Sequence, residues 1–97
     1  MCGICGILAP EVRRKELDAM TAVQHHRGPD DWGVALLEGD TVGLGHNRLS
    51  IIDLSKAGHQ PMSNAGGGLT IVFNGEVYNY RELKQELSGY PFRGDSD

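Results

Sequence analysis

Two apolar stretches on either side of a short polar turn constrain the fold of this chain most. Residues 32–37 and residues 41–49 are each of strand length, and Glu38-Gly39-Asp40 between them contains the glycine that tight hairpin turns favour. An antiparallel pair of strands is therefore predicted here. Residues 3–9 are also apolar and end at Pro10, which predicts a further, buried strand.

Residues 13–26 are predicted to form the first helix. Leu17, Met20 and Val23 recur at a spacing of three, which gives a narrow apolar face. Gly28-Pro29 is expected to end the helix, because proline cannot continue it.

A second helix is predicted directly after residue 79. Asn79 can cap it with Glu82 as the reciprocal partner, and Gly89 is placed to end it. Its expected buried stripe consists of Tyr80, Leu83, Leu87 and Tyr90. A strand at residues 69–73 is expected before it, and the glycine-rich residues 56–68 are predicted to be loop and turn. Strands before and after a helix, with a hairpin between them, indicate a layered α+β domain.

Length and composition exclude several classes of protein. Ninety-seven residues, 39% hydrophobic and 23% charged, suit one small domain that comprises residues 1–97. A net charge of −4 offers no basic patch to nucleic acid, and no apolar run approaches the ~20 residues of a membrane span. Because the N-terminus lacks the pattern of a signal peptide, the expected location is the cytoplasm. Residues 91–97 show no closing strand or helix, so the chain is expected to be the N-terminal part of a longer one.

Cys2 is the first candidate for catalysis. Removal of Met1 would leave one residue with a thiol and a free α-amine, which titrate near pH ~8.5 and ~8. The amine could then activate the neighbouring nucleophile. Taken alone, Cys2 fits the commoner role of a buried structural thiol better than that of a nucleophile. Cys5 completes a Cys-x-x-Cys pattern, but no second pair of ligands follows at comparable spacing, so no metal is expected.

Two further segments place polar groups at the ends of predicted strands. Arg48 is either a surface charge or a bidentate clamp for a carboxylate. Asn74-Gly75-Glu76 is either an ordinary turn or an oxyanion hole, in which the Asn74 amide and the Gly75 N–H converge on one point. The four histidines have no spacing that is typical of a catalytic set, and surface or structural roles are expected for them.

Five segments in this order resemble the asparagine synthetase (glutamine-hydrolysing) family at its N-terminal glutaminase domain. They are Met1-Cys2-Gly3-Ile4, Arg27-Gly28-Pro29-Asp30, Arg48-Leu49-Ser50-Ile51-Ile52-Asp53, Gln60-Pro61-Met62 and Asn74-Gly75-Glu76-Val77-Tyr78-Asn79. The resemblance covers almost the whole chain, up to Ser96-Asp97. It implies the αββα sandwich of a class II glutamine amidotransferase, a type of N-terminal nucleophile hydrolase. The sandwich would be truncated here, because the strands that complete it are missing.

The resemblance also implies a reaction and a site. Cys2 would attack the side-chain amide of glutamine, and Asn74 and Gly75 would stabilise the oxyanion. Arg48 would hold the α-carboxylate of the substrate, while Glu76 and Asp97 take its α-ammonium. The implied pocket wall is the backbone of Leu49, Ser50, Ile51 and Ile52. This set suits a zwitterion, which needs a cation for one end and carboxylates for the other.

The partners implied by the resemblance are glutamine, a synthetase domain in the same longer chain and, for the full-length protein, a second copy in a homodimer. Nucleic acid and membranes are not expected as partners. No cofactor is expected in this segment, because Mg-ATP would bind the missing synthetase domain that activates aspartate. Two alternatives stay open. One is an amidotransferase that serves another acceptor, and the other is a non-catalytic remnant that binds through its open sheet edge.

Overall fold

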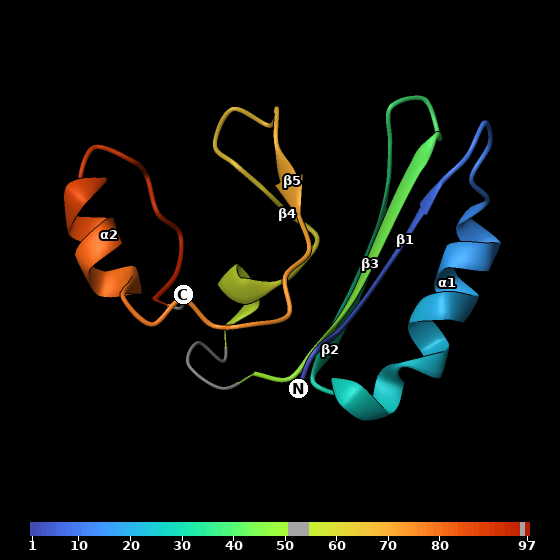
Figure 1. The fold of residues 1–97 in the computed structure, drawn as a ribbon, viewed down its shortest axis with the longest axis horizontal. Coiled ribbons are helices and arrows are strands. Elements are labelled where there is room, and N and C mark those ends of the chain that lie inside the picture. Colours follow the sequence, from blue (N-terminus) through green and yellow to red (C-terminus); the bar gives the residue numbers. More distant parts are fainter. Residues whose placement is uncertain (51–54, 96) are drawn as a thin grey trace.

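The N-terminal half of the chain forms a three-stranded antiparallel sheet. The computed structural model describes residues 1–50, 55–95 and 97. In it, β1 (Gly3–Leu8) and β2 (Asp31–Leu37) flank the central strand β3 (Val42–Arg48) (Figure 1). The three strands predicted for this half of the chain are confirmed.

The connection between β2 and β3 is the predicted tight turn. Glu38, Gly39 and Asp40 all have left-handed backbone, with φ of 53°, 61° and 63°. Glycine adopts this conformation without steric cost, whereas the two acidic residues do not. The Thr41 hydroxyl donates to the Glu38 carbonyl at 2.7 Å and so stabilises the turn.

Helix α1 (Arg14–Val23) covers one face of this sheet and forms the core with it (Figure 1). Leu17 is fully buried at 0% exposure, and Thr21 and Val12 are buried beside it. The helix lies close because β3 presents glycines to it. A Cβ added to Gly43 would lie 2.8 Å from Val12 Cγ1, and one added to Gly45 would lie 2.5 Å from Thr21 Oγ1.

The face that α1 buries differs from the predicted one. Val23 was expected on the apolar face but is 73% exposed, and Gln24 contacts the sheet instead, donating from Nε2 to the Ile4 carbonyl at 3.1 Å. At about 100° per residue, Val23 lies about 120° around the helix from Leu17, whereas Gln24 lies only about 20° away. The α-helix also ends before the predicted residue 26, and a 3₁₀ turn, η1 (His25–Arg27), follows it.

A second antiparallel sheet of two short strands follows in the sequence. It consists of β4 (Met62–Ser63) and β5 (Thr70–Ile71), preceded by the 3₁₀ turn η2 (Lys56–Gly58). The strand predicted at residues 69–73 is therefore present but shorter, and the predicted loop contains η2 and β4. Along the longest axis of the molecule, the order is α1, the three-stranded sheet, the two-stranded sheet and α2 (Figure 1).

Helix α2 (Tyr80–Glu86) forms where it was predicted, but its stripe is not buried. Leu83, Leu87 and Tyr90 are all exposed, because no strand or helix among the described residues covers them. The predicted cap is also wrong. Asn79 makes no side-chain hydrogen bond to the helix, since its backbone (φ −99°, ψ 28°) is not extended as a capping residue requires.

These elements confirm an α+β domain. Within residues 1–50, 55–95 and 97 the structure has two antiparallel sheets and two α-helices. None of the helices in these residues has the length and apolar character needed to cross a membrane.

Candidate functional site

The three-stranded sheet has two unlike faces. Successive side chains of a strand point to opposite faces, so the contacts of Gly43 and Gly45 with α1 turn His46 and Arg48 the other way. Asp31 is paired directly with Arg48 and shares its face. We call this surface, which carries Asp31, His46 and Arg48, the site face.

Cys2 lies at one end of the site face. Gly3 pairs with Asn47, so continuing the register by one residue puts Cys2 opposite Arg48. The Leu49 N–H donates to the Cys2 sulfur at 3.3 Å, and the Arg27 Nε–H donates to the Cys2 carbonyl at 3.1 Å. The thiol is therefore held beside Arg48 and Leu49, two of the residues to which the resemblance assigns substrate binding.

Met1 is 70% exposed and so is accessible to an aminopeptidase. While Met1 is present, the backbone nitrogen of Cys2 is an amide and cannot act as a base. The proton-accepting amine exists only in the processed chain. The other cysteine, Cys5, points to the opposite face, where its sulfur lies 3.5 Å from the Thr21 hydroxyl. Both cysteines are free thiols.

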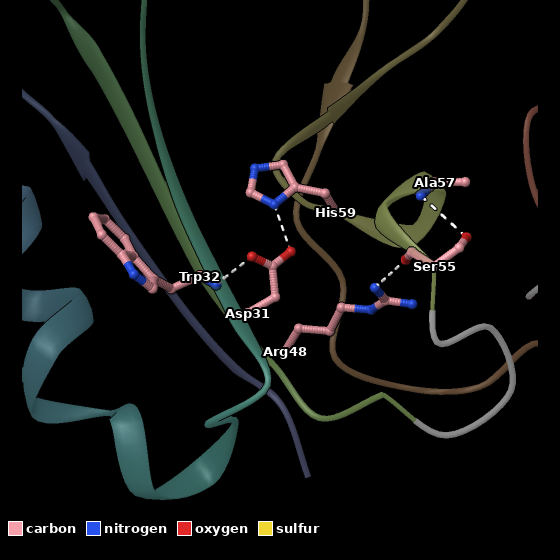
Figure 2. Close-up of polar contacts among 6 residues, drawn as sticks. All are labelled: Asp31, Trp32, Arg48, Ser55, Ala57 and His59. Carbon is pink, nitrogen blue, oxygen red and sulfur yellow. Dashed lines mark hydrogen bonds and ion pairs between the residues drawn. The ribbon is translucent and has the colours of Figure 1, made fainter.

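Arg48 is 8% exposed and its guanidinium is directed at the segment around η2. Nη1 donates to the Ser55 carbonyl at 2.5 Å, and the guanidinium also lies against Gly58, where a Cβ would collide with Nη2 (Figure 2). Figure 2 also shows Asp31 joining the same segment through His59 Nδ1, at 2.5 Å. Arg48 is therefore a buried, oriented cation rather than a surface charge.

The residues predicted after β3 are only partly described. Leu49 contacts Cys2, and the Ser50 N–H donates to Asp30 Oδ2 at 2.8 Å. Ile51 and Ile52 lie outside the described residues.

The second predicted group follows β5. Asn74 and Gly75 form the start of the connection to α2, with the ring of Phe73 packed against Gly75. A Cβ added to Gly75 would lie 2.8 Å from Phe73 Cζ, so the ring would have to shift to accept a larger residue. Asp97 Oδ2 accepts the Val77 N–H at 2.7 Å, which brings its carboxylate next to the residue that follows Glu76.

The predicted site residues thus fall into two groups. Cys2, Arg48, Leu49 and Ser50 meet at one end of the three-stranded sheet, and Asn74, Gly75, Glu76 and Asp97 lie together beyond β5. Among the described residues, no hydrogen bond joins Cys2 directly to Asn74 or Gly75. The two groups are connected through His46, whose Nε2 lies 3.1 Å from the Phe73 carbonyl.

His46 is 1% exposed, at the centre of the site face. Burial lowers the pKa of His46 below its usual range, and the nearby Arg48 lowers it further, while the hydrogen bond to Phe73 and the charge of Asp31 act in the other direction. A neutral ring that donates from Nε2 leaves Nδ1 as an acceptor, and Nδ1 has no partner among the described residues.

The sequence predicted no role in the site for Arg27, Asp30 or Gln60, and only a surface or structural role for His46. Arg27 and Asp30 belong to one segment, Arg27-Gly28-Pro29-Asp30, which wraps the end of β3. Arg27 holds the Cys2 carbonyl, Asp30 holds the Ser50 N–H, and the Asp30 N–H donates to the Arg48 carbonyl at 3.0 Å. The segment was visible as a motif of the resemblance, but only the fold shows what it contacts.

Comparison with known proteins supports the predicted relationship to glutamine amidotransferases. A family model described as a glutamine amidotransferase domain matches residues 1–97. An asparagine synthetase (glutamine-hydrolyzing) of Bacillus subtilis is 44% identical over 105 residues, covering 100% of this chain and 16% of the relative. One from Arabidopsis thaliana is 36% identical over 101 residues, covering 100% of this chain and 17% of the relative. Amidase chry2 of Gibberella zeae is 45% identical over 84 residues, covering 86% of this chain and 12% of the relative.

The chain therefore spans less than a fifth of the length of each of these three relatives. What they share with it is the glutamine amidotransferase domain, and the match of that model extends from the first residue to the last. This chain belongs to the glutamine amidotransferase domain family.

Proposed function

We propose that this chain hydrolyses the side-chain amide of glutamine, with Cys2 as the nucleophile once Met1 has been removed. The observation that carries the proposal is the position of the Cys2 thiol, next to the Leu49 N–H and on the face that carries Arg48. The α-amine of processed Cys2 is the general base, since it belongs to the residue that needs activation.

The substrate is held by its charges. Arg48 pairs with the α-carboxylate of glutamine, because a planar guanidinium matches the geometry of a carboxylate, and its contact with the Ser55 carbonyl helps to fix its orientation. Glu76 and Asp97 take the α-ammonium, and the backbone of residues 49–52 lines the pocket. The carboxylate of Asp97 is fixed by the Val77 N–H, which supports this assignment.

The reaction has two steps. The Cys2 sulfur bonds to the amide carbon, and the C–N bond breaks as the thiol proton passes through the α-amine to the leaving nitrogen, which departs as ammonia. Water then attacks the thioester, releases glutamate and restores the thiol. The Asn74 amide and the Gly75 N–H stabilise the oxyanion of both tetrahedral intermediates, a contribution that typically reaches 10²–10³ in kcat for one donor. In this proposal the chain is the N-terminal part of the αββα sandwich of an N-terminal nucleophile hydrolase, and α1 with the three-stranded sheet forms its first two layers (Figure 1).

The acceptor of the ammonia is a separate question. Two of the relatives are glutamine-hydrolyzing asparagine synthetases, and we propose ATP-dependent amidation of aspartate by a synthetase domain as the function of the whole protein. Amidase chry2 carries a different name at 45% identity, so an amidotransferase for another acceptor is the second candidate. Transfer of ¹⁵N from the glutamine side chain into asparagine, with aspartate and Mg-ATP supplied, distinguishes the two.

Release of glutamate from glutamine tests the proposal directly. Cys2→Ala is expected to lower the rate at least about 10³-fold, because loss of a nucleophile removes the acylation route. Cys5→Ala is the matched control, since Cys5 lies on the same strand but faces α1. Equal rates for Cys2→Ala and the unaltered protein would overturn the proposal. Intact mass reports whether Met1 is lost, and full activity with Met1 retained would exclude the α-amine as the base.

A further inference from the structure

Both backbone polar groups of Phe73 are bound by side chains from elsewhere in the chain. The Phe73 N–H donates to Gln60 Oε1 at 2.6 Å, and the Phe73 carbonyl lies 3.1 Å from His46 Nε2. Phe73 lies beyond β5 and has no strand partner among the residues that the structure describes. These two contacts therefore replace the sheet hydrogen bonds that its backbone would otherwise need.

His46 and Gln60 reach Phe73 from different elements. His46 belongs to the central strand of the three-stranded sheet, and Gln60 belongs to the segment between η2 and β4. Gly33 of β2 makes room for that segment, because a Cβ at Gly33 would collide with the Gln60 carbonyl and lie 2.7 Å from His59 Nε2. Phe73 is thus fixed to the sheet that carries Cys2.

Phe73 in turn fixes the residues that follow it. Asn74 is its chain neighbour, and the Phe73 ring packs on Gly75, so a Cβ added there would require the ring to shift. Any displacement of the Phe73 backbone would move the Asn74 amide and the Gly75 N–H relative to the Cys2 sulfur.

We infer that His46 and Gln60 are positioning residues that hold the Asn74-Gly75 oxyanion hole in register with Cys2. The inference rests on the proposed function, because it presupposes that Asn74 and Gly75 face the reacting carbon. Neither side chain touches the substrate in this account. Each acts through the backbone of Phe73.

The size of the effect follows from the geometry of oxyanion stabilisation. The donors act only when they lie about 2.7–3.1 Å from the developing charge. A misplacement of about 1 Å can cost about 10²-fold in rate. Loss of either contact is therefore expected to lower kcat roughly 10- to 100-fold. KM should change less than about threefold, since Arg48 binds the α-carboxylate from β3, independently of Phe73, and Glu76 alone among the binding charges directly follows the displaced turn.

Matched pairs of variants in the full natural chain separate this role from simple packing. His46→Leu removes the donor to the Phe73 carbonyl, whereas His46→Gln supplies an amide N–H that can replace it. Gln60→Leu removes the acceptor, whereas Gln60→Glu retains one. Gln60 is only partly buried, so its variants remain informative if a leucine at the buried position of His46 prevents folding.

Three measurements decide the outcome. They are kcat and KM for glutamate release, and the alkylation rate of Cys2 by iodoacetamide in the Cys5→Ala background, which requires no oxyanion hole. We expect both leucine variants to lose kcat, His46→Gln and Gln60→Glu to recover most of it, and the rate of Cys2 alkylation to stay within about twofold of that of the unaltered protein.

A leucine variant with unchanged kcat, or one whose loss lies in KM, would overturn the inference. If Cys2→Ala inactivates the protein in the same series, the proposed function survives that result. If Cys2→Ala is fully active, the proposed function itself is wrong.

Discussion

The two faces of the three-stranded sheet are buried by different means. On the face covered by α1, Gly43 and Gly45 let the helix approach, and Leu17 fills the space between them. On the site face, His46 and Arg48 are almost as buried, but they are held by hydrogen bonds to backbone carbonyls. The same strands therefore provide an apolar core on one side and an oriented polar site on the other. Substitutions on the two faces should therefore affect stability in different ways.

The largest effect is expected where the apolar core is deepest. Leu17→Ala removes a fully buried side chain and should destabilise the protein by about 2–5 kcal/mol, through lost transfer free energy and a residual cavity. Leu87→Ala, at a position 56% exposed beyond α2, is the matched control and should change stability by less than about 0.5 kcal/mol. Urea denaturation measures both. Equal losses would mean that the apolar surface around α2 is covered in the protein.

A smaller loss is expected from filling the space between β3 and α1. Gly45→Ala places a Cβ 2.5 Å from Thr21 Oγ1 and 2.6 Å from Cys5 Sγ, so strand and helix must separate. Overpacking of this kind costs about 1–3 kcal/mol. Gly66→Ala is the control, because nothing lies within 4 Å of the added carbon and the backbone there is not left-handed. A Gly45→Ala protein as stable as Gly66→Ala would show that α1 does not pack as closely as described.

For the two helices, local sequence signals predicted the position of the helix better than its buried face. Asn79, Glu82 and Gly89 correctly indicated a helix at α2, but capping and turn signals say nothing about what covers a helix. The predicted burial of its stripe was therefore wrong, as was the predicted side-chain cap by Asn79. For α1, a spacing of three identified the helix but misplaced its buried face. Position 24, not position 23, lies on the same side of the helix as Leu17.

The residues of the site also differ in whether the sequence could nominate them. Cys2, Arg48 and the Asn74-Gly75 turn could be nominated from the sequence, because each places a chemically distinctive group at a strand end. His46 and Gln60 could not, since their contacts with Phe73 join residues separated by 27 and 13 positions. Such links depend on which face of a strand a residue occupies and on how two sheets lie together. No local pattern encodes either.

Acid should lower the stability of the protein through His46 on the site face rather than through the apolar face that α1 covers. The pKa of buried His46 is lowered in the folded protein, so below pH ~6.5 the unfolded chain binds a proton that the folded chain does not. Stability is therefore unaffected by this group above that pH and falls as the pH drops toward the folded pKa, by at most about 1.4 kcal/mol per pH unit. Urea denaturation between pH 7.5 and pH 5 measures the slope. His46→Gln should flatten it, and an unchanged slope in that variant would assign the titration to another group.

The smallest effect is expected at the rim of the site face, where Asp31 pairs with the half-exposed His59 (Figure 2). When the histidine of such a pair is protonated, the pair contributes about 0.2–1 kcal/mol, because solvent screens the charges. Asp31→Asn keeps an oxygen that can accept the Trp32 N–H, which Asp31 Oδ1 binds at 2.9 Å, so the variant removes the charge with little change of shape.

Asp31→Asn should cost less than about 1 kcal/mol at low salt, and the difference should shrink further in high salt. A second consequence connects it to His46. The negative charge of Asp31 raises the pKa of His46, so its loss should extend the acid-dependent fall in stability to lower pH. A larger, salt-independent loss would mean that the pair is buried in the protein, and that the site face is closed at its rim as firmly as the opposite face is closed by α1.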